Sequence, residues 1–111
     1  MVTILRSRQP KSDESRTTRF EGCEAGSPVS FFLVDAEPGK GSSLHVHPYA
    51  ETWVVKRGKA EFTVGDEKAH ASPGDIVVAP AEVPHRWTNV GTDRLELVCI
   101  HPSARILQTS V

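Results

Sequence analysis

Three histidines and one glutamate have the residue types and the spacing of a metal site. His45 and His47 are separated by a single residue, and Glu51 follows after the short turn at residues 48–50. Residues two apart on a β-strand point to the same face, so the two imidazoles can aim at one point. Glu51 opens the next strand and can lie beside them across the hairpin. Two imidazoles and one carboxylate that converge in this way suit iron, manganese, nickel, copper or zinc.

His85 is the candidate for a fourth ligand of one divalent transition-metal ion. It stands at the head of another predicted strand, after the proline-containing segment 80–84. Three neutral imidazoles and one carboxylate leave one or two positions open on a five- or six-coordinate ion, as a working site requires. Glu51 is the candidate catalytic residue, because it could also accept a proton. An isolated histidine is more often a surface or satisfied core residue, and we expect this of His70.

The segments of the sequence that must position this site have the pattern of short β-strands. From residue 31 onward, short apolar or alternating runs are separated by turn residues. The predicted strands cover residues 31–34, 44–47, 52–56, 60–64, 76–79, 85–90 and 95–100. No window has an apolar stripe at helical spacing, so we expect little helix. Many short antiparallel strands predict an all-β fold, either a sandwich or a closed barrel.

Size and charge restrict the class of partner. At 111 residues the chain has the length of one domain, and oligomerisation would help to stabilise so small a core. Its formal net charge of −1 gives no electrostatic reason to expect nucleic acid or an anionic membrane as partner. Cys23 and Cys99 are too few for a disulfide framework, and neither a secretory leader nor a membrane span is visible. We expect a cytoplasmic protein that binds a small molecule.

Four further residues are candidates for the lining of a substrate pocket. They are Tyr49, Trp53, Trp87 and His101. Trp53 shares strand parity with Glu51, and Trp87 shares it with His85, so both indoles are predicted to face the interior. Core packing is the ordinary role of such indoles, but an aromatic-lined cavity favours a flat or apolar molecule over a phosphorylated sugar. Tyr49 is a candidate for a movable hydroxyl, and His101 either faces the site or simply ends a strand.

Two segments of the chain carry a family resemblance. Residues 39–58 read Gly, five residues, His-x-His, three residues, Glu, six residues and Gly, which resembles the first motif of the cupins. Residues 74–89 resemble the second motif and keep its Gly, Pro, His and Asn at the expected spacing. The resemblance implies an antiparallel double-stranded β-helix, the cupin jelly-roll barrel, with a metal inside near one open end. It also implies that His45, His47, Glu51 and His85 bind this metal.

The resemblance also bears on the domain boundary and on assembly. We expect residues 1–25 to form an arm or lead-in strand and residues 26–111 to form the barrel domain. Small cupins of this kind commonly pair as homodimers through sheet edges, and a homodimer is predicted here. The apolar residues 2–5 could add a strand to the sheet edge of a partner.

Glu82 is the one departure from the second motif, where the family usually has glycine. Glycine there would tolerate a positive φ in the loop before His85. Retaining that backbone shape with a glutamate would cost on the order of 1 kcal/mol. We therefore expect the loop to differ slightly, the metal site to persist and the Glu82 carboxylate to be solvated.

Cupin folds host many activities, so the fold alone does not define the reaction. The leading hypothesis is a metalloenzyme acting on a small organic molecule, with dioxygenase-type chemistry first. Manganese, nickel or zinc would instead indicate a metal-dependent isomerase or lyase. A second hypothesis is a non-catalytic cupin that binds or senses a small ligand. A purely structural barrel is the weakest reading, because a scaffold has no need of open metal positions.

Overall fold

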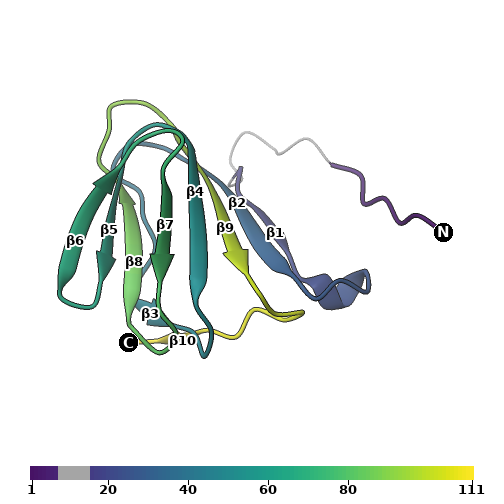
Figure 1. Ribbon diagram of the computed structural model, residues 1–111. Helices are drawn as coiled ribbons and strands as arrows, with labels where there is room; N and C mark the ends of the chain where they lie inside the picture. The colour runs from purple at the N-terminus through teal and green to yellow at the C-terminus, as the bar shows by residue number, and fades with distance from the viewer. Residues whose placement is uncertain (8–15) are drawn as a thin grey trace.

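The computed structural model describes residues 1–7 and 16–111 as two five-stranded antiparallel sheets that face each other (Figure 1). One sheet has the order β1-β2-β9-β4-β7 and the other the order β10-β3-β8-β5-β6. The strands are β1 (Thr18–Phe20), β2 (Ser30–Ala36), β3 (His45–Val46), β4 (Glu51–Arg57), β5 (Ala60–Val64), β6 (Glu67–Ala71), β7 (Ile76–Ala79), β8 (His85–Asn89), β9 (Leu95–His101) and β10 (Thr109–Ser110). The only helix among the described residues is the 3₁₀ turn η1 (Gly22–Glu24). The all-β prediction is confirmed.

Each of the seven predicted runs contains a strand, and β1 lies in the region predicted as an arm or lead-in strand, but β6 and β10 were not predicted. Strand β6 has the sequence Glu-Lys-Ala-His-Ala, whose residues have little intrinsic preference for strands. It forms because β5 holds it through a complete antiparallel register from Ala60↔Ala71 to Val64↔Glu67. Tertiary pairing therefore overrode local propensity.

The core lies between the inner faces of the two sheets. Strand β9 shows the pattern most clearly, because Leu95, Leu97, Cys99 and His101 are buried while the residues between them are half-buried. From the opposite sheet, Phe62 packs against Trp53 with 4.9 Å between ring centroids. The alternation that buries this apolar stripe also turns His101 toward the interior, which is the first of the two positions considered for it.

Two residues of the cupin-like motifs have structural tasks away from the histidines. The side chain of Asn89 is buried and donates to the carbonyls of Ala36 and Asp93, at 3.0 Å each, so it ties β8 to β2. Gly58 has φ +84°, and a Cβ there would lie 2.5 Å from the carbonyl oxygen of Arg94. Only glycine fits this turn.

The N-terminal region contributes an edge strand. Strand β1 pairs with β2 through Thr18↔Leu33, Arg19↔Phe32 and Phe20↔Phe31. Residues 1–7 extend away from the barrel (Figure 1), and residues 8–15 lie outside the described part of the chain. The domain boundary at residue 25 stays a prediction.

Cys23 is exposed and Cys99 is buried, and neither forms a disulfide. The described residues contain no helix long and apolar enough to cross a membrane.

Candidate metal centre

The structure brings the four predicted metal ligands together in the interior. One potential ligand atom from each of His45, His47, Glu51 and His85 lies within 4.8 Å of the others, and all four residues are buried. Glu51 begins β4 and His85 begins β8, while His45 of β3 lies directly opposite His85 in the strand register. The ligands therefore come from strand ends in both sheets, at one end of the barrel.

Backbone carbonyls fix the orientation of all three imidazole rings. The Nδ1 atoms of His45, His47 and His85 lie 2.7, 2.7 and 3.0 Å from the carbonyl oxygens of Ser43, Leu107 and Val83 respectively. A carbonyl can only accept, so each Nδ1 carries the hydrogen and donates it. In the neutral ring, Nε2 then keeps its lone pair, which is the arrangement of a histidine prepared to ligate a metal.

The carboxylate of Glu51 is the negative centre of this cluster. Its Oε1 lies 2.9 Å from Nε2 of His47 and 3.0 Å from Nε2 of His85, and its Oε2 lies 3.4 Å from Nε2 of His101. Burial opposes ionisation of Glu51, but the imidazoles of His101, His47 and His85 outweigh burial and hold the pKa of the carboxyl well below its usual range. Glu51 is therefore ionised at neutral pH.

The histidine pKa values move in opposite directions. Burial lowers the pKa of His45, which keeps that ring neutral at neutral pH. Burial also opposes the charged form of His47, but hydrogen bonds with Glu51 and with the Leu107 carbonyl prevail and raise its pKa. His47 therefore tends to hold a proton in the metal-free protein.

The donor set fits a bound divalent ion. The ring hydrogens of His47 and His85 lie on Nδ1, where they are donated to backbone carbonyls. In the neutral rings the Nε2 lone pairs therefore point at Oε1 of Glu51, which can only accept a hydrogen bond. Such a contact is unfavourable unless a proton or a cation lies between the groups. Three imidazole nitrogens and one carboxylate oxygen are ligands that a transition-metal ion accepts together.

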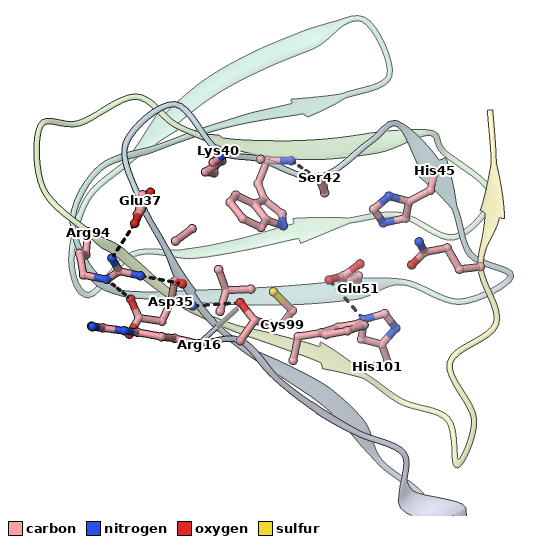
Figure 2. A pocket seen from close by; sticks show the side chains of 17 residues that line it. Arg16, Asp35, Glu37, Lys40, Ser42, His45, Glu51, Arg94, Cys99 and His101 are labelled. Carbon is pink, nitrogen blue, oxygen red and sulfur yellow. Dashed lines mark hydrogen bonds and ion pairs between the residues drawn. The ribbon is translucent and has the colours of Figure 1, made fainter. Parts of the chain in front are cut away.

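A cavity of about 710 Å³ opens beside the cluster. Figure 2 shows His45, Glu51 and His101 at one end of it and Arg94, Asp35 and Glu37 at the other. The apolar part of the wall between these ends is formed by Phe32, Val34, Trp87 and Cys99. This volume is sufficient for a small organic molecule.

The four residues proposed for the pocket occupy different positions. Trp87 and His101 line the cavity, whereas Tyr49 and Trp53 are absent from its described wall. Trp53 is buried beneath the site, with its ring 5.1 Å from that of His85. Tyr49 lies behind His101, with its hydroxyl 2.5 Å from Nδ1 of that histidine. Direct contact of the cavity by Tyr49 and Trp53 is therefore not observed.

Two parts of the site were not predicted from the sequence. The C-terminal segment supplies the Leu107 carbonyl that holds His47 and places Gln108 in the wall of the cavity. The distant end contains Arg94, whose guanidinium pairs with the carboxylate of Asp35 and lies 3.8 Å from Glu37. Neither group has a local sequence pattern, because tertiary folding alone brings these segments to the cavity.

The loop before His85 differs from our prediction. Glu82 has φ +66°, and among the described residues it is the only non-glycine with positive φ. The loop thus keeps a backbone conformation typical of glycine, and the expected change of shape is wrong. Its N–H donates to the His47 carbonyl at 2.9 Å, which holds the conformation in place. The residue is exposed, as predicted for a solvated carboxylate.

His70 lies apart from the cluster, on the exposed strand β6. Its Nε2 is 3.1 Å from Oε2 of Glu61, and its side chain is 55% exposed. Of the two ordinary positions expected for it, surface or core, it has the surface one, which makes it a suitable control for the buried histidines.

Several known proteins resemble this chain in sequence. It is 32% identical over 80 residues to the xanthan biosynthesis protein XanB of Xanthomonas campestris pv. campestris, covering 71% of this chain but only 17% of XanB. It is also 32% identical over 74 residues to the uncharacterised protein SCO3923 of Streptomyces coelicolor, covering 67% of this chain and 69% of that protein. The chain thus spans a small part of XanB but most of SCO3923.

Solved structures show the same fold. Bacillus subtilis oxalate decarboxylase, a protein with Mn(II) centres, superimposes with a TM-score of 0.80 at 23% identity, over 91% of this chain and 29% of that one. The SPY1581 protein of Streptococcus pyogenes superimposes with a TM-score of 0.67 at 18% identity, over 81% of this chain and 75% of that one. In addition, residues 32–101 match the cupin domain family over more than half of the chain. The chain therefore belongs to the cupin domain family, and its barrel is a cupin jelly roll.

Proposed function

We propose that this cupin is a metal-dependent enzyme that acts on a small organic molecule. His45, His47, Glu51 and His85 would hold one divalent transition-metal ion. The observation that carries this proposal is the common orientation of three buried imidazoles, each fixed through Nδ1 to a backbone carbonyl. Rings held in this way direct Nε2 lone pairs to one point, at no further cost of ordering when a metal binds.

Dioxygenase-type oxidation is the leading chemistry. Iron or copper with open coordination positions would supply activation of dioxygen beside a bound substrate. The chain would bind the substrate along the apolar wall that includes Phe32, Val34 and Trp87, and would exclude water from it. Glu51 is ionised and offers Oε2 as a proton acceptor, although its lowered pKa makes it a weak base. Holding the metal is therefore its principal role.

Isomerase or lyase chemistry is the alternative. Bacillus subtilis oxalate decarboxylase has Mn(II) centres on the same fold. Manganese, nickel or zinc in the present site would act as a Lewis acid on a carbonyl or enediol. The same ligand set serves either reaction, so the identity of the metal is the first quantity to determine.

Elemental analysis of protein purified without metal-affinity tags tests the proposal. The wild type should contain close to one equivalent of a transition metal, and His45→Ala and His85→Ala should each lose it. His70→Ala is the matched control, because this histidine is exposed on β6 and away from the cluster. Circular dichroism of every variant would show that loss of metal is not loss of fold.

The bound element directs the assay that follows. Iron or copper would lead to measurement of dioxygen uptake with candidate substrates, whereas zinc, manganese or nickel would lead to isomerase and lyase assays. A metabolite that copurifies and is never converted would favour a ligand-binding cupin. The proposal fails if no preparation contains a metal and added ions do not bind.

A further inference from the structure

We propose that His101 is a ligand-binding residue that donates a hydrogen bond from Nε2 to an oxygen of a small organic acid bound at the metal. This inference rests on the proposed metal site and adds the chemical class of its ligand. It assigns to His101 a task different from that of the other three buried histidines.

The position of His101 places it beside the cluster but outside the ligand set. It ends β9, is 1% exposed, and lines the cavity next to Glu51 (Figure 2). Its ring packs edge-on against that of His47, with 4.7 Å between centroids. A ligand that enters the cavity and reaches the metal therefore passes this imidazole.

Tyr49 sets the tautomer of His101. The N–H of Leu107 donates to the hydroxyl oxygen of Tyr49 at 3.3 Å, which leaves the hydroxyl hydrogen free to point elsewhere. The hydroxyl lies 2.5 Å from Nδ1 of His101, and we assign the hydroxyl as donor, because Nε2 on the other side of the ring faces the acceptor-only carboxylate of Glu51 at 3.4 Å. Nδ1 is then an acceptor, and the neutral ring carries its hydrogen on Nε2. This tautomer is the reverse of that in His45, His47 and His85, so His101 is prepared to donate rather than to ligate.

The donor has no acceptor in the described protein. Nε2 of His101 is buried and lacks a hydrogen-bond partner among residues 1–7 and 16–111. Oε2 of Glu51 lies 3.4 Å from this nitrogen, but the contact lacks hydrogen-bond geometry. A buried unsatisfied donor is unfavourable and rare in native proteins. An oxygen of a ligand in the adjoining cavity would satisfy it.

The charges around the cavity favour an anionic ligand. A divalent ion with three neutral imidazoles and the Glu51 carboxylate would retain one net positive charge. At the other end, the basic groups of Arg16, Lys40 and Arg94 outnumber the carboxylates of Asp35 and Glu37. A 2-oxo or 2-hydroxy acid matches this site, because neighbouring oxygens can reach the metal and His101 while its carbon chain lies along the apolar wall.

Pyruvate binding to the cobalt-loaded protein tests the inference. Cobalt content is measured first, and pyruvate is then titrated by calorimetry and by the visible absorption of the bound cobalt. His101→Phe keeps a ring but removes the donor, while His101→Gln restores an N–H donor. We expect His101→Phe to retain cobalt and to weaken pyruvate binding about tenfold or more, with partial recovery in His101→Gln.

One further variant and one further ligand distinguish a hydrogen-bond donor role of His101 from a structural role. Tyr49→Phe removes the group that fixes the tautomer, and it should weaken pyruvate while retaining cobalt. Methyl pyruvate lacks the carboxylate charge and should bind weakly to every variant. Equal pyruvate affinity in the wild type and His101→Phe overturns the inference, as does loss of cobalt from His101→Phe. Wild type that retains cobalt but does not bind pyruvate overturns this inference alone, whereas wild type that retains no cobalt overturns the metal proposal as well.

Discussion

Among single residues, His47 couples the metal site to pH. Its pKa is raised in the metal-free protein because hydrogen bonds with Glu51 and the Leu107 carbonyl outweigh the effect of burial. A metal must displace the proton that this ring holds. The raised pKa also stabilises the metal-free fold, a contribution that is full below the pKa of an unfolded histidine and is lost as pH rises through the folded pKa.

We therefore expect metal affinity to fall with decreasing pH. Below the pKa of His47, the apparent affinity should drop about tenfold per pH unit, since one proton is released on binding. Competition with a chelator across the range of about pH 6 to 8 measures this slope. His70→Ala should give the same profile, because its side chain is exposed and far from the ligands. An affinity that does not change over this range would contradict the prediction.

Glu82 stores strain in the loop before His85. Its φ of +66° belongs to the left-handed region, which costs a residue with a Cβ on the order of 1 to 2 kcal/mol. Glycine would relieve this cost, but it would also gain conformational freedom in the unfolded chain. Glu82→Gly should therefore raise the free energy of unfolding by at most about 1 kcal/mol.

Urea denaturation of the metal-free protein measures this effect. Glu82→Val is the opposite control, because a β-branched residue tolerates positive φ poorly and should lower stability. If Glu82→Gly were clearly destabilising, a favourable interaction of the glutamate side chain would have to exceed the backbone strain.

At the level of elements, the C-terminal segment completes the candidate metal centre. Strand β10 pairs with β3 through Thr109↔Val46 and Ser110↔His45, next to the histidine pair. The Leu107 carbonyl accepts the Nδ1 hydrogen of His47 at 2.7 Å. Partners of this kind orient a ligand ring and typically contribute about 10- to 100-fold to metal affinity.

Deletion of residues 107–111 should lower metal affinity by about 10- to 100-fold while the barrel remains folded. Chelator competition measures the affinity, and circular dichroism checks the fold. Deletion of residues 1–5, which extend away from the barrel (Figure 1), is the matched control and should leave the affinity unchanged. Unchanged affinity in the C-terminal deletion would show that the Leu107 carbonyl does not contribute to the site.

In the molecule as a whole, the outer faces of the two sheets differ. On the sheet that contains β7, Leu33, Ile76 and Val78 are 43%, 66% and 56% exposed. On the other sheet, the positions facing outward are largely polar. They are Glu61, Thr63, Lys68, His70, Arg86 and Thr88, as the registers of β5 with β6 and β8 place them. Large exposed apolar side chains gathered on one sheet face are typical of an interaction surface.

We expect a homodimer that covers this apolar face, with the edge strand β7 at its interface. Light scattering coupled to gel filtration should give the mass of a dimer for the wild type. Val78→Asp should give a monomer, because it would bury an unpaired charge at the interface. Thr63→Asp lies on the polar face and should remain dimeric. A monomeric wild type would contradict the family-based expectation of a homodimer.

The sequence by itself determined the all-β fold class and the cluster of four potential metal ligands. Strand parity is a local property, so His45 and His47 had to share a face and Glu51 had to open the return strand. The interior position predicted for Trp53 followed from the same alternation. The turn residues between the strands likewise have local effects, which is why each predicted run contains a strand.

Only the tertiary structure decided how these ligands are held. His47 depends on Leu107, 60 residues away, and Tyr49 contacts His101 across 52 residues. Strand β6 forms through pairing with β5 although its residues favour strands weakly. Such contacts depend on packing between distant segments and have no local pattern. The chain thus encodes its potential metal ligands locally, whereas the tautomers of its histidines and the walls of its cavity arise from the folded barrel.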